Sequence, residues 1–331
     1  VTNTDKGGEV MGDCIITRRG LGQAFLDFED AWFVGKNAPV SGRYRFGYLH
    51  TDNKIYYIQY DGVATCIYDI KNNSWTRGAD APETGTAIHG IGEYYNGKIY
   101  CVEINGTALH IYDIAEDEWT IGADAPASVE RFTSQLYNGK IYCPASGSTA
   151  LHIYDITSNT WTKGASAPAS VKRGISVLYN GKIYCPQNGG TALHIYDIAQ
   201  NTWTTGAPAP ASVTERWLAI LYDGKIYCPA SGGTQMQIYD IAQNTWTTGA
   251  SAPASAVRWK AVLCNGKIYC PDNGTAMHIY DIASNTWTTG TSAPSSINRN
   301  TLILYKDHLL YSLQDGGTAM QLYAISGKLV L

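Results

Sequence analysis

The strongest constraint on this chain is a segment of the form Asn-Thr-Trp-Thr-x-Gly, which recurs with small variations. Its tryptophans are Trp75, Trp119, Trp161, Trp203, Trp246 and Trp287. Neighbouring copies are 41 to 44 residues apart. Self-similarity at this period indicates stacked structural repeats, among them the blades of a β-propeller. We therefore expect one repeat architecture and not two unrelated domains.

One copy, residues 173–208, reads as four short strands. The first two are joined by Asn180-Gly181, a dipeptide that accepts positive φ at both turn positions and so predicts a tight hairpin. The strands are expected at 174–179, 182–185, 192–198 and around Trp203. Four antiparallel strands repeated at this period predict a propeller blade.

The number of blades follows from the later strands of each copy. Lys-Ile-Tyr and Ile-Tyr-Asp-Ile each occur six times, and each has a degenerate seventh copy near the C-terminus. A seventh copy of the tryptophan strand is found only at Ala31–Gly35, 43 residues before Trp75. We therefore predict an all-β, seven-bladed β-propeller of four-stranded antiparallel blades. Its last blade is closed by the N-terminal strand, which removes an open sheet edge.

Composition excludes some classes of partner. The formal net charge is −4, and charged residues make up 16% of the chain. Neither nucleic acid nor a membrane surface is favoured by such a balance. No apolar run approaches the roughly 20 residues that span a bilayer. We expect no nucleic-acid partner and no membrane partner.

The repeats resemble the kelch repeat. The residues that carry the resemblance are an Arg before the first strand, a Tyr in the second, Tyr-Asp in the third, and a Trp followed by a Pro. It covers about residues 30 to 325 and implies a propeller, a scaffold that serves both binding modules and enzymes. Where kelch repeats have two glycines after the second strand, this chain has Cys-Pro, as at Cys143-Pro144. Ligand contacts are therefore not transferred from kelch proteins.

The chain is expected to divide into a leader or attachment segment, residues 1–25, and the propeller, residues 26–331. The stretch 12–20 is similar to the opening of tail-fibre-type proteins of phages and prophages. That resemblance implies a virion or tail location within a larger assembly. The propeller itself is expected to be monomeric.

Function is expected on one face of the ring. Alternation of antiparallel strands puts the connections from strand 4 to strand 1 and the loops between strands 2 and 3 on one face, which we call the crossing face. The other two turns of each blade form the turn face. Four of the five length changes between copies fall on the crossing face, and polar differences gather there: Glu103, Asn105, Ser146, Gln187, Asn188, Asp272, Asn273, Gln314 and Asp315. Varied loops on a rigid frame indicate binding, with neutral drift as the alternative.

One cation per blade precedes the innermost strand. The ring consists of Arg45, His89, Arg131, Arg173, Arg216, Arg258 and Arg299. Guanidinium groups suit carboxylates, sulfates and phosphates, which predicts an anion site at the mouth of the central channel. Alternatively, these residues brace neighbouring loops by bonding backbone carbonyls, and both roles can coexist.

Three further residues adjoin this ring. Trp217 and Trp259 each follow an arginine and predict either stacking against a sugar ring or filling of the channel. Glu215, directly before Arg216, is a candidate ligand contact or a neutralising partner of the arginine.

Two other recurring residue types are predicted to pack. His110, His152, His194 and His278 occupy one place in successive blades and cannot converge on one metal ion. Cysteines at one place in successive blades are too far apart for disulfides. The cysteines favour a reducing, cytoplasmic environment, and no cofactor or metal motif is present.

The sequence thus predicts a non-enzymatic recognition module that binds a glycan, an anionic group or a protein partner on the crossing face. One alternative is a carbohydrate-active enzyme on a kelch scaffold, either sialic acid epimerase-like, with His89 or Glu215 as base, or oxidase-like. An oxidase of the galactose oxidase kind needs two histidines and a tyrosine at copper, and only His89 is expected near the channel. A second alternative is a purely structural repeat protein. No catalytic residue is assigned.

Overall fold

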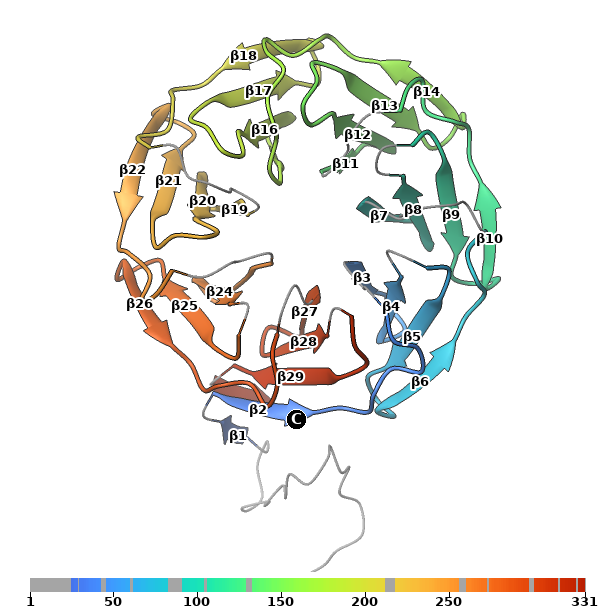
Figure 1. The fold of residues 1–331 in the computed structure, drawn as a ribbon, viewed down its shortest axis with the longest axis vertical. Helices are drawn as coiled ribbons and strands as arrows, with labels where there is room; N and C mark the ends of the chain where they lie inside the picture. The colour runs from blue at the N-terminus through green and yellow to red at the C-terminus, as the bar shows by residue number, and fades with distance from the viewer. Residues whose placement is uncertain are drawn as a thin grey trace, which may run out of the picture.

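The computed structural model describes residues 25–28, 30–42, 46–59, 62–82, 91–103, 106–128, 133–211, 218–255, 260–272, 274–297, 301–314, 316–325 and 327–330. Within these residues every regular element is a β-strand. Seven four-stranded antiparallel sheets surround a central axis (Figure 1). The predicted all-β, seven-bladed propeller is confirmed.

Each blade has its strand 1 beside the axis and its strand 4 at the rim. Blades 1 to 3 consist of β3 (Phe46–Leu49), β4 (Lys54–Ile58), β5 (Thr65–Asp69) and β6 (Ser74–Arg77); β7 (Ile91–Tyr95), β8 (Lys98–Val102), β9 (Leu109–Asp113) and β10 (Glu118–Ile121); and β11 (Gln135–Tyr137), β12 (Lys140–Pro144), β13 (Leu151–Asp155) and β14 (Thr160–Lys163). Blades 4 and 5 consist of β15 (Val177–Tyr179), β16 (Lys182–Pro186), β17 (Leu193–Asp197) and β18 (Thr202–Thr205), and β19 (Ile220–Tyr222), β20 (Lys225–Pro229), β21 (Met236–Asp240) and β22 (Thr245–Gly249). Blade 6 consists of β23 (Val262–Cys264), β24 (Lys267–Pro271), β25 (Met277–Asp281) and β26 (Thr286–Thr289).

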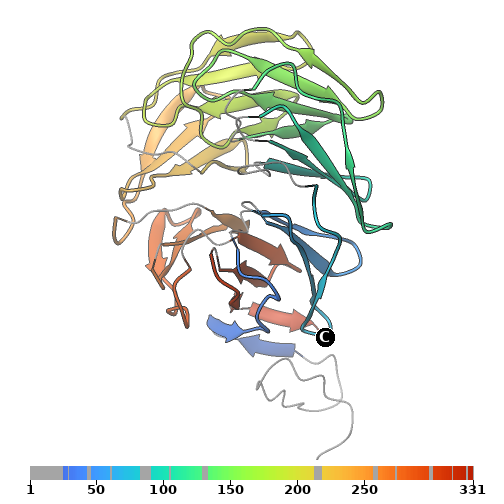
Figure 2. The ribbon, with the colours of Figure 1, turned by 45° about the vertical axis from the view of Figure 1, so that its right-hand side comes forward.

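Blade 7 joins the two ends of the chain. It contains β27 (Thr301–Tyr305), β28 (Leu309–Leu313) and β29 (Met320–Ala324), and its outermost strand is β2 (Ala31–Val34). Trp32 lies opposite Tyr323 in the antiparallel register. The predicted closure by the N-terminal strand is confirmed. Beyond it, β1 (Phe25–Phe28) pairs with β30 (Gly327–Val330) in a separate two-stranded sheet, and Figure 2 shows these terminal strands at the rim of blade 7.

The tight turns have the predicted backbone geometry. Asn180 and Gly181 have φ values of 46° and 68°, so both central residues of the hairpin are in the left-handed region, as a type I′ turn requires. The turns between strands 3 and 4 are held by the repeated aspartate. Asp197 Oδ1, for example, accepts the backbone N–H of Gln200 at 3.0 Å. Turn chemistry therefore sets the strand register on this face.

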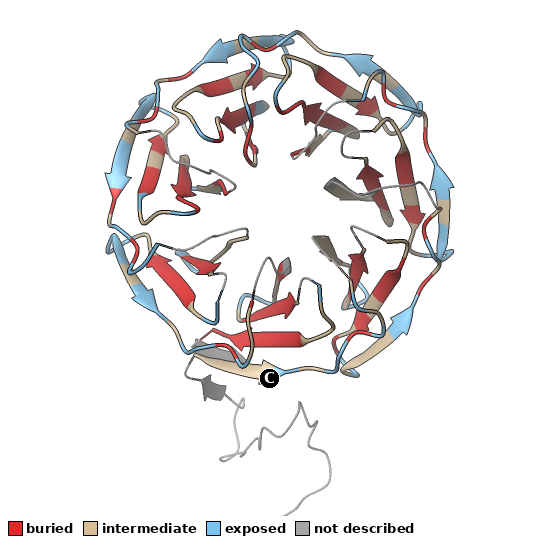
Figure 3. Cartoon of the chain, in the orientation of Figure 1, coloured by how far each residue is buried: buried red, intermediate tan, exposed pale blue. Residues whose placement is uncertain are grey.

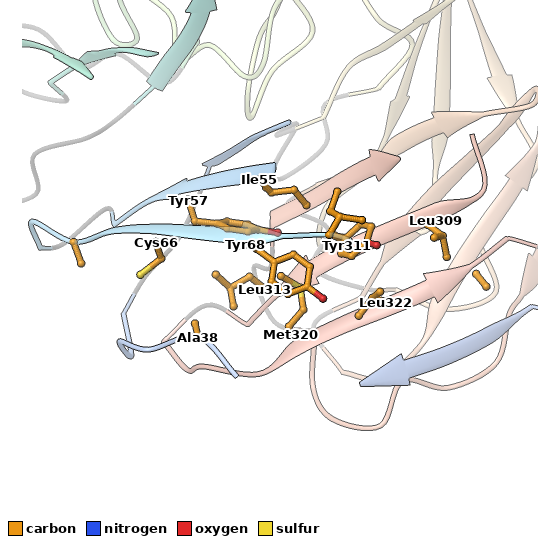
Figure 4. Packing of buried hydrophobic residues seen from close by; sticks show 13 residues of the cluster. Ala38, Ile55, Tyr57, Cys66, Tyr68, Leu309, Tyr311, Leu313, Met320 and Leu322 are labelled. Atoms are coloured by element: carbon orange, nitrogen blue, oxygen red, sulfur yellow. The ribbon is translucent and has the colours of Figure 1, made fainter. Parts of the chain in front are cut away.

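The hydrophobic core lies between neighbouring blades. Strands 2 and 3 are largely buried and the rim strands are exposed (Figure 3). Between blades 7 and 1, Tyr57 and Tyr68 pack with Tyr311, Leu313 and Met320 (Figure 4). Burying large rings between sheets provides most of the stabilisation expected for such a structure.

A two-sided clasp links each blade to the one before it. In blade 3, Asn159 Oδ1 accepts the N–H of Ala123 at 2.8 Å, and Trp161 Nε1 donates to the carbonyl of the same alanine at 2.7 Å. Tyr154 donates its hydroxyl to the same Asn159 oxygen at 2.8 Å. The same arrangement holds Lys36, Ala79, Ala165, Ala207 and Ala250. At the closing blade, Trp32 Nε1 donates to Thr291 O at 2.9 Å.

The glycine of Trp-x-x-Gly is required by this close packing. A Cβ on Gly164 would lie 2.6 Å from Leu151 Cδ2, and one on Gly122 would lie 2.7 Å from Leu109 Cδ2. These distances are shorter than van der Waals contact, so a larger residue would force the buried leucine side chain or strand 4 to shift. The recurring motif Asn-Thr-Trp-Thr-x-Gly therefore encodes the junction between blades.

Candidate functional site

The described residues include one member of the predicted site. Arg173 lies between the crossing that follows β14 and strand β15. The remaining predicted contacts lie outside the described residues: Arg45, His89, Arg131, Glu215, Arg216, Trp217, Arg258, Trp259 and Arg299. In the sequence each of them comes shortly before the innermost strand of its blade.

Arg173 holds two loops of the crossing face together. Its Nη1 donates to the carbonyls of Ala145 and Ser148 in the loop between β12 and β13, and the Ser148 distance is 2.6 Å. Its Nη2 donates to Ala169 O in the crossing at 3.1 Å. The side chain is 1% exposed. Arg173 therefore ties blade 3 to blade 4 by the carbonyl-bracing arrangement, one of the two roles predicted for the ring.

The buried guanidinium also contacts strand 3 of its own blade. Nη2 lies 3.3 Å from Nδ1 of His194, and the guanidinium carbon lies 5.7 Å from the ring centroid of Trp203. Burial lowers the pKa of Arg173, and burial together with this cation lowers the pKa of His194. A neutral His194 can offer Nδ1 as an acceptor to the guanidinium. The recurring histidine thus has a polar role that the packing prediction did not include.

Several of the polar differences on the crossing face bond to their own loops. Gln187 Oε1 accepts the N–H of Ala192 at 3.1 Å, and Glu103 Oε2 accepts that of Ala108 at 3.2 Å. Asp272 Oδ1 accepts the N–H groups of Gly274 and Ala276 at 2.8 and 3.0 Å. These side chains close the loops between strands 2 and 3. Glu103 and Gln187 close theirs in the same way, whereas the loop at Asp272 is one residue shorter.

Three more of the polar differences can be placed. Ser146 Oγ accepts the N–H of Arg173 at 3.3 Å, and Asn188 is 8% exposed, with its N–H bonded to Lys172 O at 2.8 Å. Gln314 O accepts the N–H of Gly317 at 3.3 Å. Asn105, Asn273 and Asp315 lie outside the described residues.

The turn face pairs its charges blade by blade. Lys140 Nζ lies 2.8 Å from Asp155 Oδ2, Lys225 Nζ lies 2.8 Å from Asp240 Oδ2, and Lys98 contacts Asp113 in the same way. The bond from Lys140, with the N–H of Ser158, lowers the pKa of Asp155 to about 2. This face therefore repeats one Lys–Asp pair in blades 2 to 6, whereas blade 7 has Leu309 and Ala324 at the two positions.

The innermost strands differ between two sectors of the ring. Ser134 donates its hydroxyl to Glu93 Oε1 at 2.5 Å, and Gln135 donates from Nε2 to Ser176 O at 2.9 Å. Glu93 and Gln135 both lie opposite the tyrosine of strand 2 in their blades. In blades 4 to 7 the residue at this position is apolar: Val177, Ile220, Val262 and Ile303. Burial raises the pKa of Glu93. Sequence reasoning missed this sector, although aligning the first strand of every copy would have revealed it.

A second feature missed at the sequence level is a pair of residues from non-adjacent blades. Lys260 Nζ lies 4.4 Å from the ring centroid of Phe46. Lys260 comes two residues before β23 in blade 6, and Phe46 begins β3 in blade 1. Strand 1 runs from the crossing face to the turn face, so this pair lies at the crossing-face end of the inner strands.

The recurring histidines and cysteines are buried. His110, His152, His194 and His278 are at most 3% exposed, in agreement with the packing prediction. The seven cysteines within the described ranges are buried thiols outside any disulfide, and burial raises the pKa of Cys185 to about 12. Among the residues that the structure describes, no three His, Cys, Asp or Glu side chains gather as a metal site. The same part of the chain contains no helix able to cross a membrane.

Comparison with known proteins supports the fold. No family model and no curated protein matches the sequence. Virginiamycin B lyase from Staphylococcus aureus is similar in structure with a TM-score of 0.74, 9% identity, and coverage of 90% of this chain and 100% of the lyase. The computationally designed protein Ika8 is similar with a TM-score of 0.62, 14% identity, and coverage of 83% and 82%. At such identities the likeness concerns the propeller alone, and the kelch and tail-fibre resemblances stay predictions.

Proposed function

We propose that this chain is a non-enzymatic recognition module that binds a glycan or an anionic group of a partner. The binding surface is the crossing face around the central axis. The proposed ligand contacts are Arg45, His89, Arg131, Arg216, Trp217, Arg258, Trp259, Arg299 and Glu215. Arg173 belongs to the same ring, and its bonds to loop carbonyls support a positioning role for it.

The observation that carries the proposal is the contrast between the two faces. The turn face repeats the same Lys–Asp pair and the same tight turn in blades 2 to 6. On the crossing face the loops between strands 2 and 3 differ in their polar residues, as at Glu103 and Gln187, and the loop at Asp272 is also one residue shorter. Variation confined to the loops of a rigid scaffold is typical of a surface that discriminates ligands.

Charge adds a second support. The aspartates that balance Lys140, Lys182 and Lys225 lie on the turn face, so their negative charge is neutralised locally and far from the proposed site. A cation position at the start of each innermost strand would then dominate the field at the crossing face, despite the formal net charge of −4.

The proposal is tested by a thermal-shift screen with neutral, carboxylated and sulfated oligosaccharides, because a ligand that binds only the folded state raises the unfolding midpoint. We expect at least one acidic sugar to raise the midpoint of the wild-type protein. Binding of that sugar should be lost in the double variant Arg216→Ala, Arg258→Ala.

The matched control is Lys140→Ala, which removes a cation from the turn face and should leave sugar binding unchanged. The proposal is wrong if no sugar shifts the wild-type protein. If the double variant binds the sugar as tightly as the wild type, the role proposed for the arginine ring is wrong.

A further inference from the structure

We infer that Lys260 and Phe46 together form the point on the crossing face that recognises a carboxylate-bearing sugar. The inference rests on the proposed function and adds to it the chemical class of the ligand and two residues that contact it. The lysine would bind the carboxylate, and the phenyl ring would face the apolar side of the sugar.

Position is the first support. Lys260 and Phe46 stand at the starts of the innermost strands of blades 6 and 1. Strand β27 of blade 7 lies between those strands and contacts both of them. The lysine side chain therefore spans the inner end of blade 7 to reach the ring, with Nζ 4.4 Å from the ring centroid. Figure 1 shows β3 and β27 beside the axis.

Comparison of the blades is the second support. The register position two residues before Val262 is occupied in the other copies by Phe46, Ile91, Thr133, Ile175, Leu218 and Thr301. Lys260 is the one cation of this set and Phe46 the one aromatic residue. The two residues that differ from the repeated pattern, Lys260 and Phe46, lie in blades that are not neighbours and contact each other. Independent sequence changes in single loops do not explain this contact.

The chemistry of the pair is the third support. An aromatic face attracts an ammonium through its quadrupole and holds the long lysine side chain in one direction. An ammonium is a compact point charge with three donors, so an ammonium oriented in this way suits a single carboxylate. Both residues are partly exposed.

The neighbours in sequence fit the same ligand. Trp259 directly precedes Lys260, and Arg45 directly precedes Phe46. Both are among the proposed ligand contacts of the crossing face. A sugar acid offers a hydroxylated ring and one anionic group, which is the combination that aromatic and cationic residues recognise together.

The test measures affinity for a pair of sugars that differ only in their acid group, glucuronic acid and glucose oligosaccharides of equal length. We expect Lys260→Met to weaken binding of the acidic sugar about tenfold and to leave binding of the neutral sugar unchanged. Lys260→Arg should restore most of the affinity. Phe46→Leu should weaken both sugars, because it removes the ring that both would contact.

Lys172→Met is the matched control, since Lys172 is an exposed lysine on the same face, and its affinities should equal those of the wild type. The unfolding midpoint of each variant without sugar separates a purely structural cation–π contact from ligand binding. If Lys260→Met lowers the midpoint but binds the acidic sugar as tightly as the wild type, the inference is wrong and the proposed function stands. If the wild-type protein binds no carboxylated sugar but binds a sulfated sugar in the wider screen, this inference alone is wrong.

Discussion

Trp161 donates its indole N–H to the carbonyl oxygen of Ala123 at 2.7 Å, although the two residues belong to different blades. Asn159 accepts the N–H of the same alanine at 2.8 Å. The backbone N–H and C=O of one residue of the preceding blade are thereby both bonded by residues two positions apart in the sequence. Because the motif recurs, the ring is held by a series of equal junctions and not by one dominant contact.

Removing one side of this clasp should cost a measurable part of the stability. Trp161→Phe keeps an aromatic ring but deletes the N–H donor, so the free energy of unfolding should fall by about 1 kcal/mol. Asn159→Gly tolerates the φ of 52° at this position but deletes both accepted bonds, so a fall of about 1 to 2 kcal/mol is expected. Urea denaturation followed by tryptophan fluorescence measures both. Thr162→Ala, on the exposed side of the same strand, is the control and should change little.

Arg173 should be far more sensitive than an exposed arginine. Lysine at this position cannot bond to the carbonyls of Ala145, Ser148 and Ala169 at once, so Arg173→Lys leaves buried acceptors unpaired. We expect a loss of about 2 to 4 kcal/mol in the free energy of unfolding. Arg77→Lys, in an exposed pair with Asp80, should change it by less than about 1 kcal/mol. Equal effects of the two substitutions would contradict the bracing role.

Glu93 should make the protein less stable as the pH rises. Its pKa is raised in the folded protein, so the folded state binds this proton more tightly than the unfolded state. The contribution to stability is complete below the ordinary pKa of 4.5 and is lost as the pH rises through the folded-state value. Glu93→Gln keeps an acceptor for Ser134 and has no such loss. Between pH 4 and pH 8 the unfolding midpoint of the wild type should therefore fall relative to that of Glu93→Gln. If the two midpoints change with pH in the same way, Glu93 does not have a raised pKa in the folded protein.

Asp155 should have the opposite pH dependence. Its pKa is lowered to about 2 by Lys140 and by the backbone N–H of Ser158, from an ordinary value of 3.8. Its stabilising contribution is therefore present above pH 3.8 and is lost as the pH falls towards 2. Asp155→Asn should lower the midpoint at pH 7, and the difference from the wild type should shrink at acidic pH. If the difference is the same at both pH values, the ion pair contributes nothing.

Fold and closure could be predicted because both depend on periodicity. The position of Trp32 relative to Trp75 was enough to assign β2 to blade 7. Strand ends were less predictable. The first strand of blade 4 was expected from residue 174, but β15 begins at Val177. Pairing with β16 shifts by one residue between Val177 opposite Tyr184 and the isolated bridge of Arg173 with Gln187. In this stretch the N–H of Ser176 bonds to Thr133 Oγ1 in the preceding blade at 2.8 Å. Such bonds between blades have no signature in a single repeat.

The candidate site was predictable as a face and less so as a set of contacts. The arginine ring is visible in the sequence, but the acceptors of Arg173 come from two separate loops that only the folded chain brings together. The contact between Lys260 and Phe46 joins residues that are far apart in sequence and in blades separated by a third. Polar positions such as Gln187 looked like ligand contacts because they vary, and they close their own loops instead.

The pairing of β2 with β29 also has a consequence for synthesis on the ribosome. The strand that closes the ring is translated before the blades, and its partner is translated after nearly all of them. The nascent chain must therefore keep the tryptophan strand unpaired while six blades form, which leaves it open to wrong partners. Closure of so long a loop costs entropy that is recovered only when the strand docks. Docking of β2 on β29, and not the folding of any one blade, is then the step that commits the molecule to its ring.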